Sequence, residues 1–344
     1  MSTALSRTVG RAYWLLLGVI VFASCAPEES ALLRAEPRER AFHFRYEVVV
    51  RDLPESFEGG YLWLPVPANT EDQTIRNVTV HSPLSYERVR DSRHGNEAIR
   101  FDLQPGVTSV QAVLEFSVVR QERIRRPGDL PRHATPPPEE ELALWLSPDR
   151  RVPIHGWVRE RADETVAGKH TNLEKARAIY DHAVLELRYD KSGSGWGNGD
   201  IFWACDAKRG NCTDFHALFI GFTRAVGIPA RFEIGFAVPS DRPAGEISGY
   251  HCWAQFFLEG QGWIPVDASE AHKHQEKRDY FFGAHDENRV LFTVGRDLEL
   301  PGMQGEPLNF FIYPYAEVDG TRHAAVEAKF HYRDLQPPAS GASP

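Results

Sequence analysis

Two common signatures of zinc sites, CxxC and HExxH, are missing from this chain of 344 residues. Four side chains could in principle be ligands: Cys205, Cys212, His251 and Cys252. Nothing in their spacing favours zinc, and we expect neither a bound metal nor a cofactor. The glycine-rich run KSGSGWGNGD likewise lacks the GxxxxGK pattern of a phosphate-binding loop. We interpret this run as a loop that lines or positions a substrate.

The chain also has fewer basic than acidic residues. The chain has 39 Lys and Arg against 48 Asp and Glu, a formal net charge of -9. Removal of residues 1–24, which contain two arginines and no acidic residue, would change the net charge from -9 to -11. Such a surface gives no support for nucleic-acid binding.

No apolar run is long enough for a comfortable membrane span. The run Tyr13–Ala23 is shorter than the roughly 20 residues that a bilayer requires. It follows two arginines and is succeeded by Ser24 and Cys25, a pattern that resembles a bacterial lipoprotein signal with its lipid-accepting cysteine. We expect residues 1–24 to be removed and residues 25–40 to form a solvated tether, lipid-anchored at Cys25 in the bacterial cell envelope, on its periplasmic or extracellular face. An ordinary or uncleaved secretory signal is the alternative.

Cysteine is scarce, with four residues in the chain. Apart from Cys25, an odd number remains in an oxidising compartment: Cys205, Cys212 and Cys252. We predict a disulfide between Cys205 and Cys252, which would leave Cys212 free. A bridge between Cys205 and Cys212 is the alternative.

Cys212 opens a segment with helical periodicity. Apolar residues recur at helical spacing from Phe215 to Val226, and Gly227 and Pro229 end the pattern. The N-terminus of this predicted helix would lower the pKa of the thiol, and its N–H groups can hold a developing oxyanion. Asp214, in the first turn, would partly counter the lowered pKa, and we interpret it as a helix-capping charge.

A histidine and an aspartate follow on predicted strands. In the strand 250–258, alternation places His251 and Cys252 on opposite faces, which makes Cys252 a poor nucleophile for that imidazole. The returning strand 263–268 carries Asp267. The two side chains share a face only if the connecting loop has an odd number of residues or a bulge resets the register. Asp267 could then orient the imidazole through one nitrogen and leave the other for the thiol.

Two segments together resemble a known family. GNCTDFHALFIGFTRAVGIPARF and GYHCWAQFFLEGQGWIPVDASEA are similar to the catalytic core of the transglutaminase-like superfamily, which includes transglutaminases, bacterial cysteine peptidases and peptide N-glycanases. The resemblance implies a papain-like α+β fold. It also implies that Cys212 is the nucleophile, His251 the general base and acid, and Asp267 the residue that orients His251.

The resemblance also implies a function and leaves several alternatives. It favours a cysteine peptidase or amidase that acts on a peptide or protein amide in the bacterial envelope. A protein-glutamine transglutaminase and a non-catalytic module that binds peptide or glycan are the alternatives. Family members add an upstream side-chain donor to the oxyanion hole, for which Trp196, Asn198 and Trp203 are candidates here. His216 is expected to be packed or hydrogen-bonded, with contact to the site as the alternative.

Residues 41–122 are typical of a small β-sandwich, which would precede the catalytic core. Short and often alternating segments are separated by Pro, Gly, Asn and Asp; they are FHFRYEVVV, YLWLPV, NVTVHS, AIRFDL and VQAVLEFSVV. Trp63 and Phe116 are assigned to its core.

We divide the rest of the chain into three predicted parts, the first of which is rich in proline. Residues 123–140 are predicted to be an extended linker, residues 141–300 the catalytic domain, and residues 301–344 a C-terminal extension whose strands pack on the core. The expected helices begin near three residues: Glu139, Ile154 and Thr171, the last with a capping box.

Overall fold

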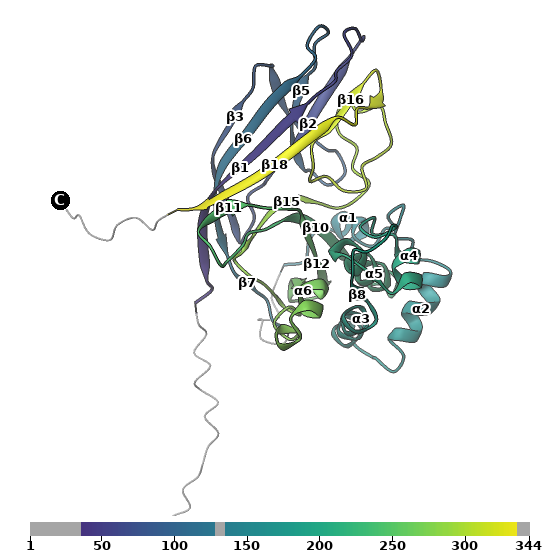
Figure 1. The fold of residues 1–344 in the computed structure, drawn as a ribbon. Helices are drawn as coiled ribbons and strands as arrows, with labels where there is room; N and C mark the ends of the chain where they lie inside the picture. The colour runs from purple at the N-terminus through teal and green to yellow at the C-terminus, as the bar shows by residue number, and fades with distance from the viewer. Residues whose placement is uncertain (1–35, 128–134, 336–344) are drawn as a thin grey trace, which may run out of the picture. The chain divides into compact units, whose positions relative to one another are not determined.

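The computed structural model describes residues 36–127 and 135–335 of the chain. The predicted signal segment, Cys25 and most of the predicted tether lie outside these residues. By their contacts, the described residues from Pro37 onward belong to one compact unit. Within the described part, two five-stranded sheets and one four-stranded sheet combine with six α-helices, an α+β architecture (Figure 1).

The first five-stranded sheet consists, in order, of β11 (Ala244–Glu246), β18 (Val326–Asp334), β1 (Glu39–Val50), β6 (Val110–Gln121) and β3 (Gln73–His81). Burial alternates along β1, so that Phe42, Phe44 and Tyr46 point to the core and their neighbours are partly exposed. This period of two is that of a strand with one face buried.

The second five-stranded sheet consists, in order, of β17 (Thr321–Arg322), β16 (Tyr315–Val318), β2 (Gly60–Val66), β5 (Glu97–Asp102) and β4 (Tyr86–Arg90). On one of its faces, buried residues such as Leu62, Leu64 and Phe101 share a hydrophobic cluster with those of the first sheet, as in a β-sandwich. Phe116 is fully buried in this cluster, which confirms its assignment to the sandwich core. Trp63 is also fully buried, but it belongs to a separate cluster with Leu298, Leu300 and Phe311 rather than to the sandwich core. The sequence analysis did not predict β4, because its residues are mostly exposed and show no apolar alternation.

The sandwich draws its strands from both ends of the chain. The segment 326–335 was expected to pack on the core as an extension, but β18 lies inside the first sheet and pairs with β1 along nine residues. β16 likewise pairs with β2. The predicted sandwich boundaries, 41–122, therefore leave out strands that complete both sheets. Residues 336–344 lie outside the described residues.

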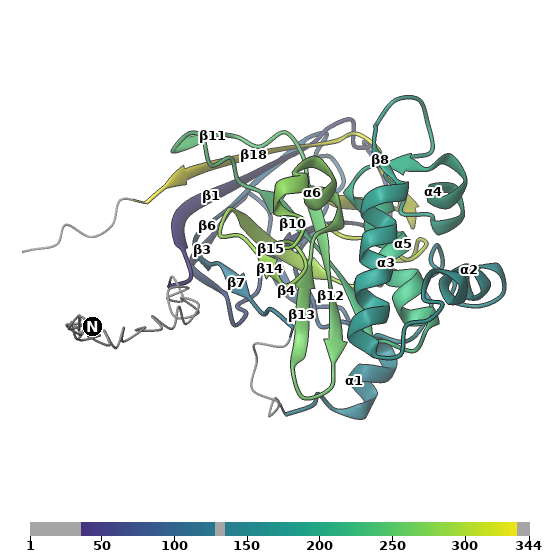
Figure 2. The same ribbon diagram turned by 90° about the horizontal axis from the view of Figure 1, so that it is seen from below.

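The four-stranded sheet carries the helices. It consists, in order, of β13 (Gly262–Val266), β12 (His251–Leu258), β10 (Ala230–Ala237) and β15 (Arg289–Val294). The helices are α1 (Glu139–Leu144), α2 (Trp157–Thr165), α3 (Asn172–Glu186), α4 (Ile201–Ala207), α5 (Cys212–Ala225) and α6 (Ala268–Lys273). Helix α5 packs on β12 and β10, with α2, α3, α4 and α6 around it (Figure 2). All 14 residues of α5 are consequently buried.

Several predicted boundaries hold and others shift. Helix α1 begins at Glu139, and Thr171 caps α3 through the expected capping box with Glu174. Helix α2 begins only at Trp157, and β1 begins inside the predicted tether. The predicted linker contains β7 (Arg123–Ile124), which pairs with β14 (Ala284–His285). The remaining short elements are the strands β8 (Arg188–Tyr189) and β9 (Arg209–Gly210), which pair in parallel, and the 3-10 helix η1 (Gln275–Lys277).

Gly235 of β10 lies directly opposite His251 of β12, where a register shift toward β15 begins. A Cβ at this position would collide with the carbonyl oxygen of Val290. We expect Gly235→Ala to lower the free energy of unfolding by about 1–3 kcal/mol, because packed strands must separate to admit it. Urea unfolding measures this effect. Gly59→Ala is the control, because its Cβ would meet no atom within 4 Å; equal midpoints for the two variants would contradict the expectation.

Candidate active site

Cys212 is the first residue of α5, as the sequence predicts. The side chain of Asn211 caps the helix by accepting the Thr213 N–H at 2.9 Å, and Asp214 completes a capping box by accepting the Asn211 N–H at 2.9 Å. Cys212 is only 1% exposed. Its own N–H has no hydrogen-bond partner among the residues that the structure describes. A buried donor of this kind beside a thiol can donate to a developing oxyanion.

Asp214 also holds the glycine-rich loop. Its carboxylate accepts the N–H groups of Gly197 at 2.7 Å and Gly199 at 3.1 Å. Burial raises the pKa of Asp214, although these backbone hydrogen bonds oppose the change. The residue is therefore the predicted helix cap, and it also ties the loop KSGSGWGNGD to the start of α5.

His251 and Asp267 are in direct contact. The ring of His251 is hydrogen-bonded through Nε2 to Oδ2 of Asp267 at 2.7 Å. Three residues join the last pair of the hairpin, Leu258 with Gly262, so the requirement for an odd loop is met. The prediction that the strand continues to Ala268 is wrong. Strand β13 ends one residue before Asp267, which instead caps α6 because its side chain accepts the Glu270 N–H.

The carboxylate of Asp267 is fully buried and fully engaged. Oδ1 accepts hydrogen bonds from the Ser269 hydroxyl and the Glu270 N–H, each at 3.0 Å, and Oδ2 lies 3.2 Å from Nη1 of Arg289. Burial would raise the pKa of Asp267, but the positive charges of His251 and Arg289 hold it well below its ordinary value. The sequence analysis missed Arg289, because nothing in the spacing of the motif points to a strand that follows 22 residues later.

The second ring nitrogen of His251 is left for Cys212. Burial disfavours the charged forms of both side chains. Their interaction with each other and the negative charge of Asp267 favour the charged forms instead. The pKa of His251 rises to about 10, because the charge and hydrogen bond of Asp267 and the contact with Cys212 outweigh burial. The pKa of Cys212 falls well below its ordinary value, because hydrogen bonds from the side chains of Cys252 and His251 outweigh burial. The two groups therefore form a thiolate and imidazolium pair near neutral pH.

The three cysteines of the described residues are free, so the predicted disulfide between Cys205 and Cys252 is wrong, and the alternative bridge from Cys205 to Cys212 is not formed either. Sγ of Cys252 lies 3.8 Å from Thr213 Oγ1 and 3.8 Å from Nδ1 of His216. Its side chain also interacts with the thiol of Cys212, and together with burial this raises the pKa of Cys252 well above its ordinary value. Cys252 therefore packs against Thr213 and His216 of α5.

Cys252 is expected to support the thiolate of Cys212. Cys252→Ala removes one hydrogen bond to the sulfur, which should raise the pKa of Cys212 and slow its alkylation by iodoacetamide below the plateau pH. A loss of about 1 kcal/mol corresponds to about fivefold in rate. Modification of Cys212 is followed by mass spectrometry against pH. Cys205→Ala is the matched control and should leave the profile unchanged. An unchanged profile for Cys252→Ala would show that its thiol does not stabilise the anion.

His216 connects α5 to the segment that carries Asp267. It is fully buried, its Nδ1 lies 2.8 Å from the carbonyl oxygen of Cys212, and its Nε2 accepts the Ala268 N–H at 3.2 Å. Because Nε2 accepts, Nδ1 carries the proton and donates to the carbonyl. Burial lowers the pKa of His216, so the ring stays neutral. The expectation that His216 is packed and hydrogen-bonded is confirmed, and the ring also contacts the site through the Cys212 carbonyl and the Ala268 N–H.

Tyr250 lies beside the start of α5, and the sequence analysis did not single it out. Its hydroxyl accepts a hydrogen bond from Nδ2 of Asn211 at 2.9 Å and lies 2.8 Å from the hydroxyl of Thr213. Burial raises the pKa of Tyr250, so its hydroxyl stays protonated. The strand alternation could have found it, because Tyr250 shares the face of Cys252.

The three predicted oxyanion donors all belong to the glycine-rich loop or follow it. Trp196 Nε1 donates to the Gly193 carbonyl at 3.1 Å, and Asn198 Nδ2 donates to the Gly195 carbonyl at 3.1 Å. Trp203 packs so closely on Gly195 that a Cβ there would collide with its indole. Two of the three donors are thus engaged within the loop, and the choice among them stays a prediction.

Residues 36–127 and 135–335 contain no group of three or more His, Cys, Asp or Glu side chains that could hold a metal ion. Over the same ranges, no helix combines the length and the apolar character needed to cross a bilayer.

The central part of the chain carries a domain of the transglutaminase-like superfamily, whose members are typically cysteine-based enzymes. The model of that superfamily matches residues 159–268, a range that contains Cys212, His251 and Asp267. The chain is also 30% identical over 319 residues to an uncharacterized protein of Haemophilus influenzae, with 80% of this chain and 84% of that protein covered.

Solved structures support the fold assignment. A candidate cysteine protease from Cytophaga hutchinsonii superposes with a TM-score of 0.62 at 16% sequence identity, covering 89% of this chain and 94% of that chain. The periplasmic domain of TgpA from Pseudomonas aeruginosa gives a TM-score of 0.36 at 16% identity, covering 72% of this chain and 97% of that chain. At these identities the first likeness concerns the fold alone, and the second is too distant to argue from.

Proposed function

We propose that this protein is a thiol-dependent acyltransferase that hydrolyses amide bonds of peptides or proteins in the bacterial envelope, with Cys212, His251 and Asp267 as its catalytic residues. One observation carries the proposal. His251 is fixed to Asp267 through Nε2 at 2.7 Å, and the interaction of its ring with Cys212 helps to raise the pKa of His251 to about 10. An oriented imidazole within reach of an ionised thiol is the arrangement that nucleophilic catalysis requires.

The chemistry follows from these contacts. The Cys212 thiolate attacks the amide carbonyl, and the free N–H of Cys212 donates to the oxygen that becomes negative. His251, protonated in the ion pair, gives its proton to the leaving amine as the C–N bond breaks. Water then attacks the thioester while His251 takes one of its protons. The products are a carboxylic acid and the regenerated thiolate and imidazolium pair.

Access to the sulfur is part of the proposal. Because Cys212 is 1% exposed, productive binding requires the side chains or loops around it to move. The glycine-rich loop is a suitable segment, since Gly195, Gly197 and Gly199 all have positive φ and Asp214 anchors it at one end.

The location in the envelope rests on the N-terminal pattern alone. The lipid-accepting Cys25 and residues 1–24 lie outside the described residues. Metabolic labelling of expressing bacteria with an alkyne fatty acid tests the anchor: wild-type protein is expected to carry the label, and Cys25→Ser is not.

The reaction is tested by mass spectrometry. The chain is incubated with a glutaminyl peptide library, with and without a primary amine, in parallel with Cys212→Ala and the control Cys205→Ala. Hydrolysis produces free acids and does not depend on the amine, whereas cross-linking yields the amine adduct. The expected result is hydrolysis by wild type and Cys205→Ala. Product formation that persists in Cys212→Ala would end the assignment, and an adduct would favour the transglutaminase alternative. If no product forms and an electrophilic amide probe fails to label Cys212, the non-catalytic alternative holds.

A further inference from the structure

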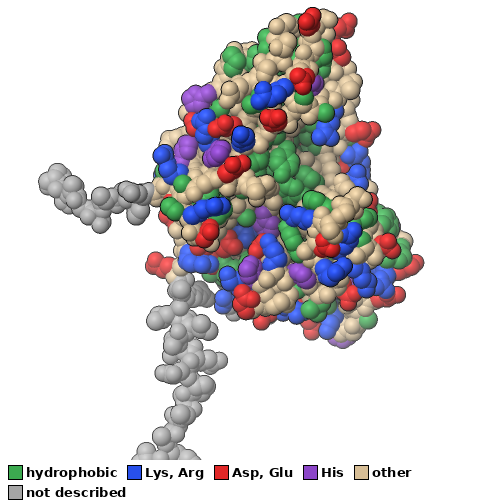
Figure 3. All heavy atoms as spheres, in the orientation of Figure 1, with side chains coloured by type: hydrophobic (Ala, Val, Ile, Leu, Met, Phe, Trp, Pro, Cys, Tyr) green, Lys and Arg blue, Asp and Glu red, His purple; other side chains and the backbone are tan. Residues whose placement is uncertain are grey.

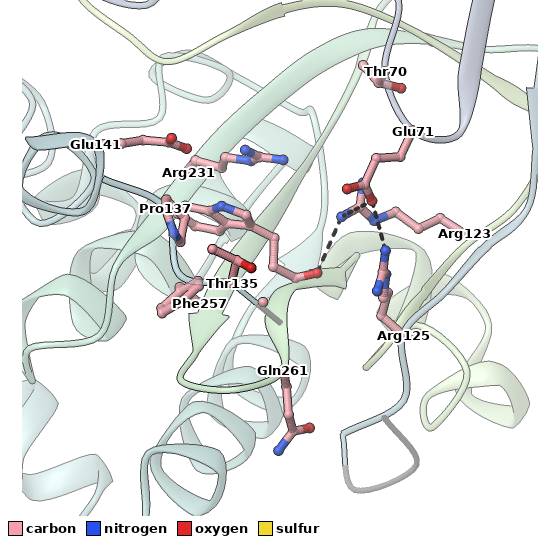
Figure 4. A pocket seen from close by; sticks show the side chains of 12 residues that line it. Thr70, Glu71, Arg123, Arg125, Thr135, Pro137, Glu141, Arg231, Phe257 and Gln261 are labelled. Carbon is pink, nitrogen blue, oxygen red and sulfur yellow. Dashed lines mark hydrogen bonds and ion pairs between the residues drawn. The ribbon is translucent and has the colours of Figure 1, made fainter. Parts of the chain in front are cut away.

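A second pocket lies far from the catalytic residues, at the opposite end of the β12–β13 hairpin (Figure 4). It measures about 580 Å³, and its walls include Arg123, Arg125 and Arg231 together with Phe257 and Trp263. Phe257 lies six residues along β12 from His251, which corresponds to about 20 Å. The pocket is therefore separate from the site that contains Cys212.

Three guanidinium groups converge on this pocket in a chain with a net charge of -9. Two carboxylates, Glu71 and Glu141, also line it. Arg231 faces Arg123 across the pocket, as Figure 4 shows. The lining thus has an excess of positive charge in an acidic protein, which favours an anionic occupant.

Arg123 has hydrogen-bonding capacity that the protein does not use. Its side chain is 10% exposed, its Nη1 and Nη2 contacts to Asp72 and to the Trp263 carbonyl are long at 3.4 Å each, and its buried Nε has no hydrogen-bond partner among the described residues. Buried donors are normally satisfied, so an unpaired donor beside a cavity points to a ligand. A planar guanidinium is suited to a carboxylate held by two parallel hydrogen bonds.

Glu71 shows how a carboxylate can bind between the arginines of this pocket. Its Oε2 lies 2.8 Å from Arg125 and 3.7 Å from Arg123, between the two arginines. The side chain of Glu71 is 69% exposed, so these ion pairs are weak and another carboxylate can replace it.

The opposite part of the pocket is aromatic. The guanidinium of Arg231 stacks over the ring of Trp263 at 4.5 Å, and Trp263 packs edge-on against Phe257. Such a surface accepts an apolar or aromatic group. The ligand chemistry is therefore a carboxylate at one end and an apolar group at the other.

We infer that this pocket binds a small organic carboxylate with an apolar or aromatic end, either as a free acid or as the C-terminal residue of a peptide. The carboxylate replaces Glu71 between Arg123 and Arg125, and the apolar end rests on Trp263 and Phe257.

Calorimetric titration of the full chain tests this inference with 3-phenylpropanoate, its neutral amide, and a tripeptide that ends in phenylalanine with a free or amidated terminus. Saturable binding of the acid at about millimolar concentration or tighter is expected, without binding of the amides. Tighter binding of the free-terminus tripeptide than of the acid identifies a peptide terminus as the source, and the reverse identifies a free acid.

Two variants sharpen the test in opposite directions. Arg125→Gln is expected to weaken binding about tenfold, through the loss of a charge-assisted hydrogen bond. Glu71→Gln is expected to strengthen it several-fold, because the internal competitor loses its charge. Arg51→Gln, an exposed arginine of the sandwich that pairs with Glu327, is the control and should have no effect. Absence of saturable binding, equal binding of acid and amide, inorganic phosphate that binds as tightly as the acid, or unchanged binding by Arg125→Gln would each overturn the inference.

Discussion

Replacing His251 with alanine is expected to abolish the reactivity that distinguishes Cys212 from the other cysteines. Without the imidazolium, burial is no longer outweighed and the pKa of Cys212 rises. A thiol with an ordinary pKa of about 8.5 is only a few per cent ionised at pH 7, so alkylation of Cys212 should slow by about 30-fold. Turnover of an amide substrate should fall by about 10⁴-fold, because the leaving amine also loses its proton donor.

The pH profile provides an independent measurement. In the wild-type protein the thiolate persists from well below the usual thiol pKa, and His251 keeps its proton until pH approaches its pKa of about 10. Turnover should therefore reach its plateau at a pH well below the usual thiol pKa and decline near pH 10, as His251 deprotonates. His170→Ala, which changes an exposed histidine, is the control and should retain both the rise of turnover at low pH and its decline near pH 10. A wild-type alkylation profile in His251→Ala would rule out the ion pair.

Replacing Arg289 with methionine is expected to cause the largest loss of stability among single charge changes near the site. Arg289 is 2% exposed and pairs with Asp267 at 3.2 Å and with Asp286 at 3.1 Å, while its guanidinium lies 4.8 Å from the ring of Trp253. Methionine fills similar space but leaves two carboxylates without their cation. Breaking a buried pair in this way costs about 3–5 kcal/mol.

Chemical denaturation monitored by circular dichroism measures this loss, with Arg161→Met as the matched control. Arg161 forms an exposed pair with Glu164 on α2, for which a loss of less than about 1 kcal/mol is expected. Arg289→Met should also disturb Asp267 and therefore reduce the alkylation rate of Cys212. A denaturation midpoint equal to that of Arg161→Met would mean that the Arg289 cluster contributes little to the folded state.

Local signals in the sequence determined much of the active site. Asn211 followed by the apolar period fixes where α5 begins, because capping and periodicity act over a few residues. Alternation in β12 and the length of the hairpin loop likewise fix the relation between His251 and Asp267, since register follows from loop length. The superfamily motif could thus be recognised without coordinates.

Contacts between distant segments could not be predicted in the same way. Cys252 was expected to pair with Cys205, but the packing of α5 on β12 brings it to Cys212 instead. The end of β13 was missed because Asp267 can continue a strand or cap a helix, and the following turn of α6 decides between them.

The amino-acid sequence by itself determined the start of the nucleophile helix, the hairpin that carries His251, and the order of the three reactive groups, because each depends on interactions between near neighbours. Only the tertiary structure decided that β18 closes a sheet beside β1, that Arg289 pairs with the carboxylate of Asp267 while His216 links α5 to Ala268, and that three arginines line a distant pocket. These contacts join residues far apart in the chain, and their free energy comes from burial and charge pairing that local periodicity does not encode.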